Sequence, residues 1–215
     1  MPAAQRSYGG RTADARRTAR QASLRETALD IMAANEWRTA TVDKVCAAAG
    51  LNKRYFYESF TDLDALAAAV VDAIADDVRE ATLAAVAETE GQPLEYQAFV
   101  GVSAAVRTLV EDPRRARVLL GGVAASSAFL DHRVAVMHDL TGVLIEHGRR
   151  VHDVALERDP LAKVAPAFIV GGSADAILAW VNGAIDVTLD ELISQLATLW
   201  LITGNGAAEI ARGRA

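Results

Sequence analysis

Residues 41–60, TVDKVCAAAGLNKRYFYESF, form the stretch of sequence that decides the fold. Thr41 is a good N-cap for a helix because its hydroxyl accepts a free amide hydrogen of the first turn. Gly50 ends that helix, since glycine adopts the left-handed conformation at the least cost. Asn52 then caps a second helix almost at once. Between Thr41 and Gly50 the spacing i, i+3, i+4, i+7 predicts one buried stripe, made of Val42, Val45, Cys46 and Ala49.

The second helix is dense in cationic and aromatic side chains. At about 100° per residue, Phe56 and Phe60 share one side of it, which suits the core. The side chains predicted to point away from the core are Arg54, Tyr55 and Glu58, and those predicted at its boundary are Lys53 and Tyr57.

A helix, a glycine turn and a cationic second helix are the layout of a helix-turn-helix. The planar fork of Arg54 suits two acceptors of guanine in the major groove. Lys53 and the hydroxyl of Tyr57 are better suited to phosphate oxygens. Spacing alone leaves an alternative open, which is an ordinary helical hairpin with a solvated basic face.

Composition favours an all-α globular protein of one or two domains. The chain has 215 residues, of which 52% are hydrophobic and 23% charged, so apolar material for a core is ample. Strand-like alternation is scarce, and alanine and leucine are frequent.

Charge is distributed unevenly along the chain. The net charge of −6 argues against a nonspecific nucleic-acid binder. Residues 1–60, however, carry ten Lys and Arg against six Asp and Glu, a balance of +4, and residues 61–215 carry a balance of −10. The positive end contains the helix-turn-helix pattern, which is where an electrostatic footprint for DNA belongs.

Features of other protein classes are missing from the sequence. The single Cys46 excludes an internal disulfide and lies on an apolar stripe, which favours a buried small hydrophobe over a redox sensor. There is no apolar secretory segment and no uninterrupted apolar run of about 18 residues. We therefore expect a cytoplasmic protein, associated with the nucleoid when bound to DNA.

No catalytic or metal-binding constellation is recognisable. None of the histidines pairs at i, i+4 with another ligand, and no P-loop or Rossmann fingerprint is present. Gly171-Gly172-Ser173 does not continue to the last glycine of a nucleophile elbow. We expect no enzyme, no cofactor and no metal.

The residue pattern of the rest of the chain predicts helices separated by turn residues. The N-terminal arm, residues 1–15, is predicted to be flexible and basic, and both a minor-groove contact and a solvated tail remain open for it. The predicted helices cover about 17–34, 42–49, 52–60, 62–88, 93–111, 113–123, 131–157, 161–182 with a start or kink at Pro166, and 188 to near Gly204.

The N-terminal segment resembles the DNA-binding domain of the tetracycline-repressor (TetR) family of transcriptional regulators. The resemblance covers ALDIMAANEW, TATVDKVCAAAGLNKRYFYESF and TDLDALAAAVVDAI, about residues 20–75. The matching positions are Thr41, Val42, Ala48, Ala49, Gly50, Lys53, Tyr57, Phe60, Asp64 and Leu66. Departures from the family pattern are Glu36, Arg54, Tyr55, Glu58, Asp62 and Leu63. Glu36 stands where the family usually has glycine, so Asn35 is expected to supply the left-handed turn after the first helix. Arg54 and Tyr55 replace smaller residues, which suggests an operator sequence of its own, and Glu58 is expected either to accept from cytosine or to face away from DNA.

The resemblance implies an all-α fold of about nine helices in two domains. Residues 16–75 would be the helix-turn-helix DNA-binding domain, and residues 76–215 the effector-binding and dimerisation domain. It implies a regulator, most simply a repressor released from a palindromic operator by a small molecule. The alternative is a helical activator or architectural protein without an effector. The residues expected to contact DNA are Thr41, Lys44, Asn52, Lys53, Arg54, Tyr55 and Tyr57.

The resemblance also implies a homodimer and a mainly apolar effector. The last two helices are apolar on every side and would pair with their copies across a two-fold axis. The residues expected at this interface are Ile169, Gly172, Ala176, Leu192, Leu196, Leu199 and Trp200. The residues expected around the effector are Phe99, Phe129, His138, Asp175 and Trp180, with Ser173 as a further polar candidate. For each of these, packing in the core or the dimer seam remains the alternative.

Overall fold

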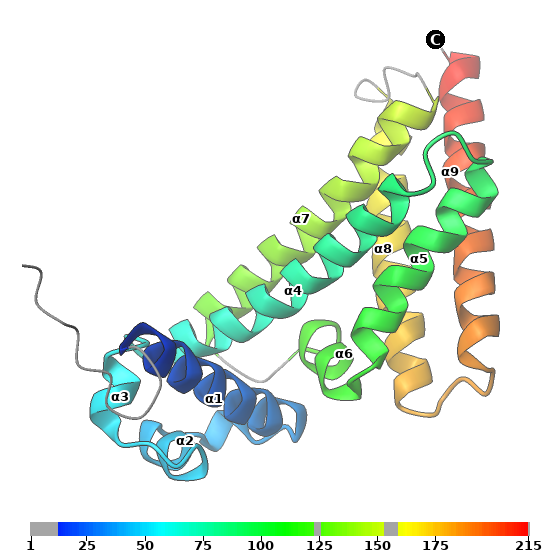
Figure 1. Cartoon of the computed structure of the whole chain (residues 1–215). Coiled ribbons are helices and arrows are strands. Elements are labelled where there is room, and N and C mark those ends of the chain that lie inside the picture. Colours follow the sequence, from blue (N-terminus) through cyan, green and yellow to red (C-terminus); the bar gives the residue numbers. More distant parts are fainter. Residues whose placement is uncertain (1–12, 123–125, 153–158, 215) are drawn as a thin grey trace, which may run out of the picture. The chain divides into compact units, whose positions relative to one another are not determined.

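The computed structural model describes residues 13–122, 126–152 and 159–214, and in these ranges the chain is helical with no strand (Figure 1). Its elements are α1 (Ala13–Ala33), the 3-10 helix η1 (Trp37–Thr39), α2 (Val42–Ala48), α3 (Lys53–Tyr57), α4 (Leu63–Ala87), α5 (Leu94–Val110), α6 (Pro113–Leu119), α7 (Ser127–His152), α8 (Pro160–Val181) and α9 (Leu189–Arg214). The predicted all-α fold is confirmed.

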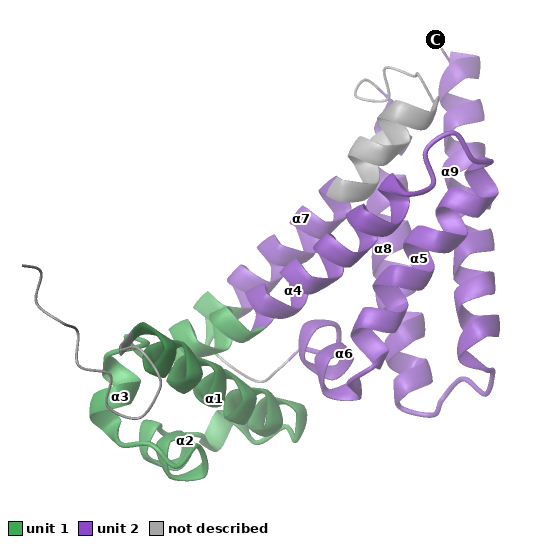
Figure 2. Ribbon diagram, viewed as in Figure 1, with its two compact units in different colours: residues 1–70, 123–129 green, residues 71–122, 130–215 purple. Residues whose placement is uncertain are grey.

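The chain divides into two compact units (Figure 2). Unit 1 comprises residues 1–70 and 123–129, and unit 2 comprises residues 71–122 and 130–215. The boundary falls inside α4, five residues before the boundary expected from the sequence. The predicted flexible arm, residues 1–15, lies mostly outside the described residues.

Unit 1 is built on the apolar faces of its first helices. α1 packs on α2 and η1, and α2 packs on α3. The fully buried side chains come from each of these elements and from the start of α4: Leu24, Ala28, Met32, Trp37, Val45, Cys46, Phe56, Leu66 and Ala67. The predicted stripe of α2 therefore does face the core, with Val45 and Cys46 buried and Val42 and Ala49 half-buried.

Local signals set the turns of unit 1 as expected. Asn35 adopts φ 60° and Gly50 φ 65°, so both turns use the left-handed conformation. The hydroxyl of Thr41 accepts from the amide of Lys44, and the Asn52 side chain accepts from the amide of Tyr55. Both predicted N-caps are thereby confirmed.

Unit 2 is a helical bundle in which α9 packs on α5 and α8, and α6 packs on α5 and α8. Its interior is aliphatic, with buried residues from every described helix: Val71, Ile74, Val78, Val102, Val106, Leu109, Val118, Leu119, Val136, Ile169, Ile177, Leu192, Ile193 and Leu196. Asp112 caps α6, with Pro113 in the first turn. A capping box opens α9, because Thr188 and Glu191 exchange hydrogen bonds.

Several helix boundaries differ from the expectation, among them the start of α1 at Ala13 and the end of α6 at Leu119. α8 begins at Pro160, capped by Asp159, and continues through Pro166. α7 begins at Ser127 rather than near 131, because the Ser126 hydroxyl accepts from the amide of Phe129. The part of the predicted seventh helix beyond residue 152 lies outside the described residues.

The last helix does not end near Gly204 but runs to Arg214. Gly204 is not among the residues with positive φ, so it does not act as a helix terminator. Ala208 and Ala211 are buried and extend the stripe of Ile193 and Ala197, so packing outweighs the low helix propensity of glycine.

Candidate nucleic-acid interface

The α2–turn–α3 segment has the geometry of a helix-turn-helix. Three residues separate the end of α2 from Asn52, and the amide of Leu51 donates to the carbonyl of Cys46 to close the turn. α3 is anchored by Phe56, which is fully buried and contacts the rings of Tyr57 and Phe60. Phe56 therefore anchors α3 in the core, and the remaining side chains extend from a helix whose position is fixed.

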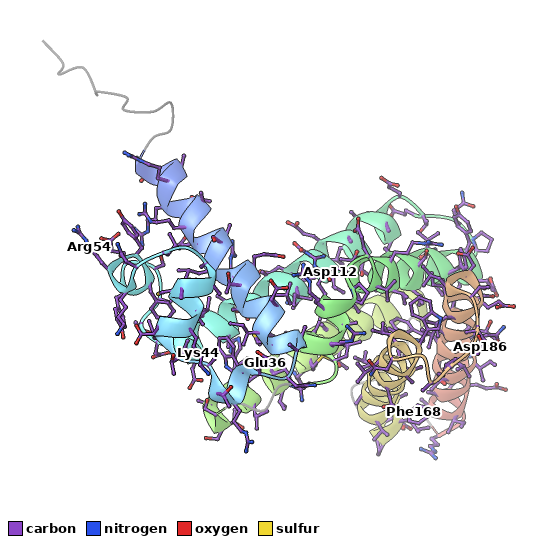
Figure 3. The ribbon with its side chains drawn as sticks, turned by 90° about the horizontal axis from the view of Figure 1, so that it is seen from below. Glu36, Lys44, Arg54, Asp112, Phe168 and Asp186 are labelled. Carbon is purple, nitrogen blue, oxygen red and sulfur yellow. The ribbon has the colours of Figure 1, made fainter. Side chains whose placement is uncertain are left out.

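The faces of α3 agree with the prediction at most positions. Arg54 points away from the helix, with 82% of its side chain exposed (Figure 3). Tyr57 is 60% exposed, which suits a contact with a large ligand. Phe60 is half-buried, so Phe56 alone supplies the fully buried anchor of this face.

Tyr55 does not point freely into solvent as expected. It is half-buried, and the guanidinium carbon of Arg20 lies 4.4 Å from the centroid of its ring. No local pattern in the sequence indicates this contact, because Arg20 lies in α1, 35 positions before Tyr55. Tyr55 therefore supports a neighbouring cation by a cation–π contact.

The three predicted DNA-contacting cations each have a partner within unit 1. The Nζ of Lys44 donates to the carbonyl of Thr39 at 2.9 Å. The Nζ of Lys53 lies 2.8 Å from Asp43 on an exposed surface, and this hydrogen bond raises the pKa of Lys53 above its usual value. The Nε of Arg54 donates to Glu58 at 2.9 Å.

Thr41 and Asn52 have structural roles before any role in binding. Their side-chain oxygens accept backbone amide hydrogens at the starts of α2 and α3. Both residues are exposed, so the positions assigned to DNA contact remain accessible. Their assignment as DNA-contacting residues stays a prediction.

Cys46 is a core residue. It is 4% exposed, and burial, followed by the charge of Asp43, raises the pKa of its thiol. The thiolate needed for reactivity is therefore disfavoured at neutral pH. In the described ranges, no group of three or more His, Cys, Asp and Glu residues is placed to hold a metal ion.

The five residues expected around an effector are not alike in their surroundings. Phe129 is fully buried but belongs to unit 1, whereas the other four lie in unit 2. Phe99 is 41% exposed on α5. The indole of Trp180 donates to the carbonyl of Val187 at 2.8 Å, which fixes the connection between α8 and α9.

The two polar anchors proposed for the effector are exposed in the chain. His138 lies on an exposed face of α7, and Asp175 on an exposed face of α8. Asp175 therefore has solvent around its carboxylate, which offsets the cost of a charged group in so apolar a helix, and its role toward an effector stays a prediction. Ser173, by contrast, accepts from the indole of Trp200 at 2.7 Å.

The residues expected at the dimer interface divide into two groups. Ile169, Leu192 and Leu196 are buried inside unit 2, so they have little surface left for a contact between subunits. Their positions in the helical repeat put them where α8 and α9 pack on neighbouring helices. Ala176 and Trp200 are half-buried, while Gly172 and Leu199 are exposed.

An exposed apolar face runs along α8 and α9. On α8, Val164 is 60% and Phe168 68% exposed, and Figure 3 shows Phe168 pointing outward. On α9, Leu199 is 57% and Ile202 64% exposed. We call these four residues, with Gly172 between them, the α8–α9 face.

The composition of α8 makes this exposure unusual. Residues Val164–Val181 are long and apolar enough to cross a membrane by length and composition alone, and 17% of the segment is buried within the chain. A core helix of a soluble protein would be mostly covered. The α8–α9 face is therefore open to solvent in the single chain.

Comparison with known proteins identifies the fold. No protein-family model and no curated protein matches the sequence. Among solved structures, the fatty acid degradation regulator FadR from Bacillus halodurans is 18% identical with a TM-score of 0.68, covering 85% of this chain and 94% of that chain. FadR from Bacillus subtilis, solved in complex with stearoyl-CoA, is 14% identical with a TM-score of 0.65, covering 83% and 96%.

A third structure links the fold to the resemblance seen in the sequence. A TetR family transcription regulator from Marinobacter aquaeolei is 16% identical with a TM-score of 0.57, covering 90% of this chain and 96% of that chain. The chain therefore has the fold of these regulators along nearly its whole length. The predicted architecture, an N-terminal helix-turn-helix domain followed by a helical domain, is confirmed.

Proposed function

We propose that this chain, which has the fold of TetR-family regulators, is a sequence-specific DNA-binding transcriptional regulator that acts as a repressor. The observation that carries the proposal is the outer face of α3, where Arg54 and Tyr57 extend from a helix whose opposite face is locked into the core by Phe56. A rigid helix with exposed hydrogen-bond donors is what readout in the major groove requires. Lys44 and Lys53 add positive charge for phosphate contacts.

The proposed active form is a homodimer joined through the α8–α9 face. Two features support a second copy as the occupant. The face continues across two helices that pack on each other, and helix-turn-helix readers commonly bind two half-sites with two-fold symmetry. In such a symmetric contact, Phe168 and Leu199 of each copy would be buried. Asp175 and Gly172 lie on the same side of α8 and would come close to the two-fold axis.

The proposed signal is a small, mainly apolar effector bound by unit 2. Support comes from the aliphatic interior of this unit and from the stearoyl-CoA complex of the structurally similar Bacillus subtilis FadR. Effector binding would have to favour a dimer whose two α3 helices no longer match the operator. Reciprocity then requires operator DNA to weaken effector binding by the same factor, about 5–150-fold.

The proposed location is the cytoplasm, with the nucleoid as the site of action. The alternative function, an activator or an architectural protein without an effector, shares the DNA-binding surface. An architectural protein would bind many sequences with similar affinity. An activator would be separated from a repressor by the direction in which transcription changes when the gene is deleted.

Capture of genomic DNA fragments by the purified protein tests the proposal. The wild type should enrich a small set of fragments over bulk DNA. Lys53→Ala and Tyr57→Phe should lower recovery of all fragments, because phosphate contacts carry no sequence information. Arg54→Ala should instead lower the ratio by which specific fragments are enriched over bulk DNA. At the base pair that Arg54 contacts, discrimination between bases should fall by about 5–150-fold. Equal recovery of all fragments by the wild type would rule out a sequence-specific regulator.

A further inference from the structure

We propose that Glu58 is a specificity-determining residue that acts through Arg54: it orients the Arg54 guanidinium for guanine and weakens its attraction to phosphate. The inference rests on the proposed DNA-binding function and deepens it. The sequence offered two other roles for Glu58, a direct contact with cytosine or a position facing away from DNA. The structure places its carboxylate between two arginines instead.

The first contact sets the direction of the reading side chain. The Nε–H of Arg54 donates to Oε1 of Glu58 at 2.9 Å. A guanidinium has five N–H donors in a planar fork, one of them on Nε. With Nε engaged, the donors left for DNA lie on the two terminal nitrogens, side by side at the end of the group. That is the arrangement that matches O6 and N7 of guanine.

The pairing also reduces the conformational freedom that Arg54 loses on binding. Its side chain is 82% exposed, so Glu58 is the contact that holds it. A side chain that is already oriented in the free protein loses less rotamer entropy when it binds a base.

The second contact fixes Glu58 itself. Its Oε2 lies 3.6 Å from Nη2 of Arg20, which comes from α1. The Arg20 guanidinium in turn lies over the Tyr55 ring at 4.4 Å, and 23% of its side chain is exposed. An ordinary i, i+4 pair on a helix surface is mobile and weak. Here Arg20 of α1 also pairs with Glu58, so the carboxylate is held in place and can position Arg54.

The charge of Glu58 has a separate effect on specificity. Nonspecific binding depends on attraction between cations and DNA phosphates. A carboxylate within hydrogen-bonding distance offsets the charge of Arg54 and repels nearby phosphates. Base hydrogen bonds through the terminal nitrogens remain available. Glu58 would therefore lower affinity for unrelated DNA more than affinity for the correct site.

Asp43 provides a matched control on the same surface. It pairs with Lys53 at 2.8 Å, and both side chains are exposed. Asp43→Asn and Glu58→Gln change the charge of each subunit by the same amount. Asp43→Asn releases Lys53, and Glu58→Gln releases Arg54 together with Arg20, whose side chain is the less exposed of the two arginines. Lysine, however, presents a point charge without a fork, so its orientation does not matter for base readout. Only the Glu58 variant should change base preference.

The experiment measures dissociation constants of the full chain by fluorescence anisotropy, over a range of KCl concentrations. The DNAs are a site selected from random sequence, the same site with single base-pair changes, and an unrelated duplex. Glu58→Gln and Asp43→Asn should both bind the unrelated duplex more tightly, and their salt dependence should steepen by about 0.9 in log–log slope for each added phosphate contact. Glu58→Gln alone should lose discrimination at the base pair read by Arg54, by about fivefold or more.

Two further variants separate orientation from charge and direct readout from support. Glu58→Asp keeps the charge but shortens the side chain, so it should lose discrimination while its affinity for unrelated DNA stays at the wild-type value. In an Arg54→Ala background, Glu58→Gln should leave discrimination unchanged, because Glu58 acts through Arg54. Circular dichroism spectra matching the wild type confirm that each variant is folded.

The outcomes distinguish this inference from the proposed function. If Glu58→Gln discriminates as Asp43→Asn does, or if its effect persists without Arg54, the supporting role of Glu58 is wrong while the regulator remains. If the wild type selects no site at all, the proposed function fails and takes this inference with it.

Discussion

Replacing Phe168 by alanine should separate the subunits without unfolding them. Phe168 is 68% exposed in the chain, so about two thirds of its surface is left to be covered by a partner. Complete burial of a phenylalanine stabilises by roughly 1.5–3 kcal/mol, and two thirds of that is about 1–2 kcal/mol. A two-fold interface contains the residue twice, so the loss is about 2–4 kcal/mol per dimer. The dimer dissociation constant should therefore rise by about 30- to 700-fold.

Sedimentation equilibrium from nanomolar to micromolar concentration measures this constant. Val134→Ala is the matched control, because Val134 is 62% exposed in unit 2 but lies on α7, outside the α8–α9 face. Leu196→Ala should behave differently from both. Leu196 is 4% exposed, so its truncation should cost about 2–5 kcal/mol of unfolding free energy in urea. A Phe168→Ala dimer as tight as the wild type, or a wild-type monomer at micromolar concentration, would refute the assignment of this face.

Further predictions concern single residues, with free energies taken from urea unfolding followed by circular dichroism unless another measurement is named. Asn35→Ala should destabilise by about 1 kcal/mol, because alanine tolerates the left-handed conformation at φ 60° poorly, and Asn35→Gly should be nearly neutral. Gly204→Ala should stabilise by about 0.5–1 kcal/mol, since the residue is inside α9 with open space around a Cβ atom, and destabilisation would contradict a continuous helix there. The Arg114 hydrogen bonds hold the pKa of Asp112 below its usual value. The folding stability that the ionised Asp112 contributes is therefore present above the ordinary aspartate pKa of about 4, and it is lost as pH falls through the lower folded pKa. Asp112→Ala should lower the free energy of unfolding by about 0.5–2 kcal/mol at pH 7, because the cap is lost. This difference from the wild type should shrink as the pH is lowered into the acid range. A difference that does not change with pH would contradict the ion pair.

The local structure of unit 1 was predictable because each signal acts over a few residues. Thr41 and Asn52 cap the helices that follow them, and Gly50 turns the chain between them. The buried stripe at Val45 and Cys46 follows from helical spacing alone. These interactions connect residues that are close in sequence, so the local pattern of residue types is enough to predict them.

What the sequence did not predict depends on packing between distant segments. The contact of Arg20 with Tyr55 and Glu58 joins α1 to α3 and its C-cap, and no local pattern indicates it. The pair between Arg54 and Glu58 could have been found from its i, i+4 spacing.

The same limit applies to unit 2. α8 is apolar on most sides, so periodicity did not show that Asp175 lies on an exposed face. The resemblance placed Leu192 and Leu196 at the dimer interface, and the structure buries both inside the unit. Where every face of a helix is apolar, the choice between core and interface comes from the arrangement of its neighbours.

Selection of bound sites from random DNA by the purified full chain tests the central claim most directly. A dimeric helix-turn-helix reader predicts an inverted repeat whose half-site centres lie about one helical turn apart, roughly 34–36 Å. A guanine contacted by Arg54 should recur at one symmetric position in each half. Recovery of unenriched sequence, or of a motif without two-fold symmetry, would contradict the account.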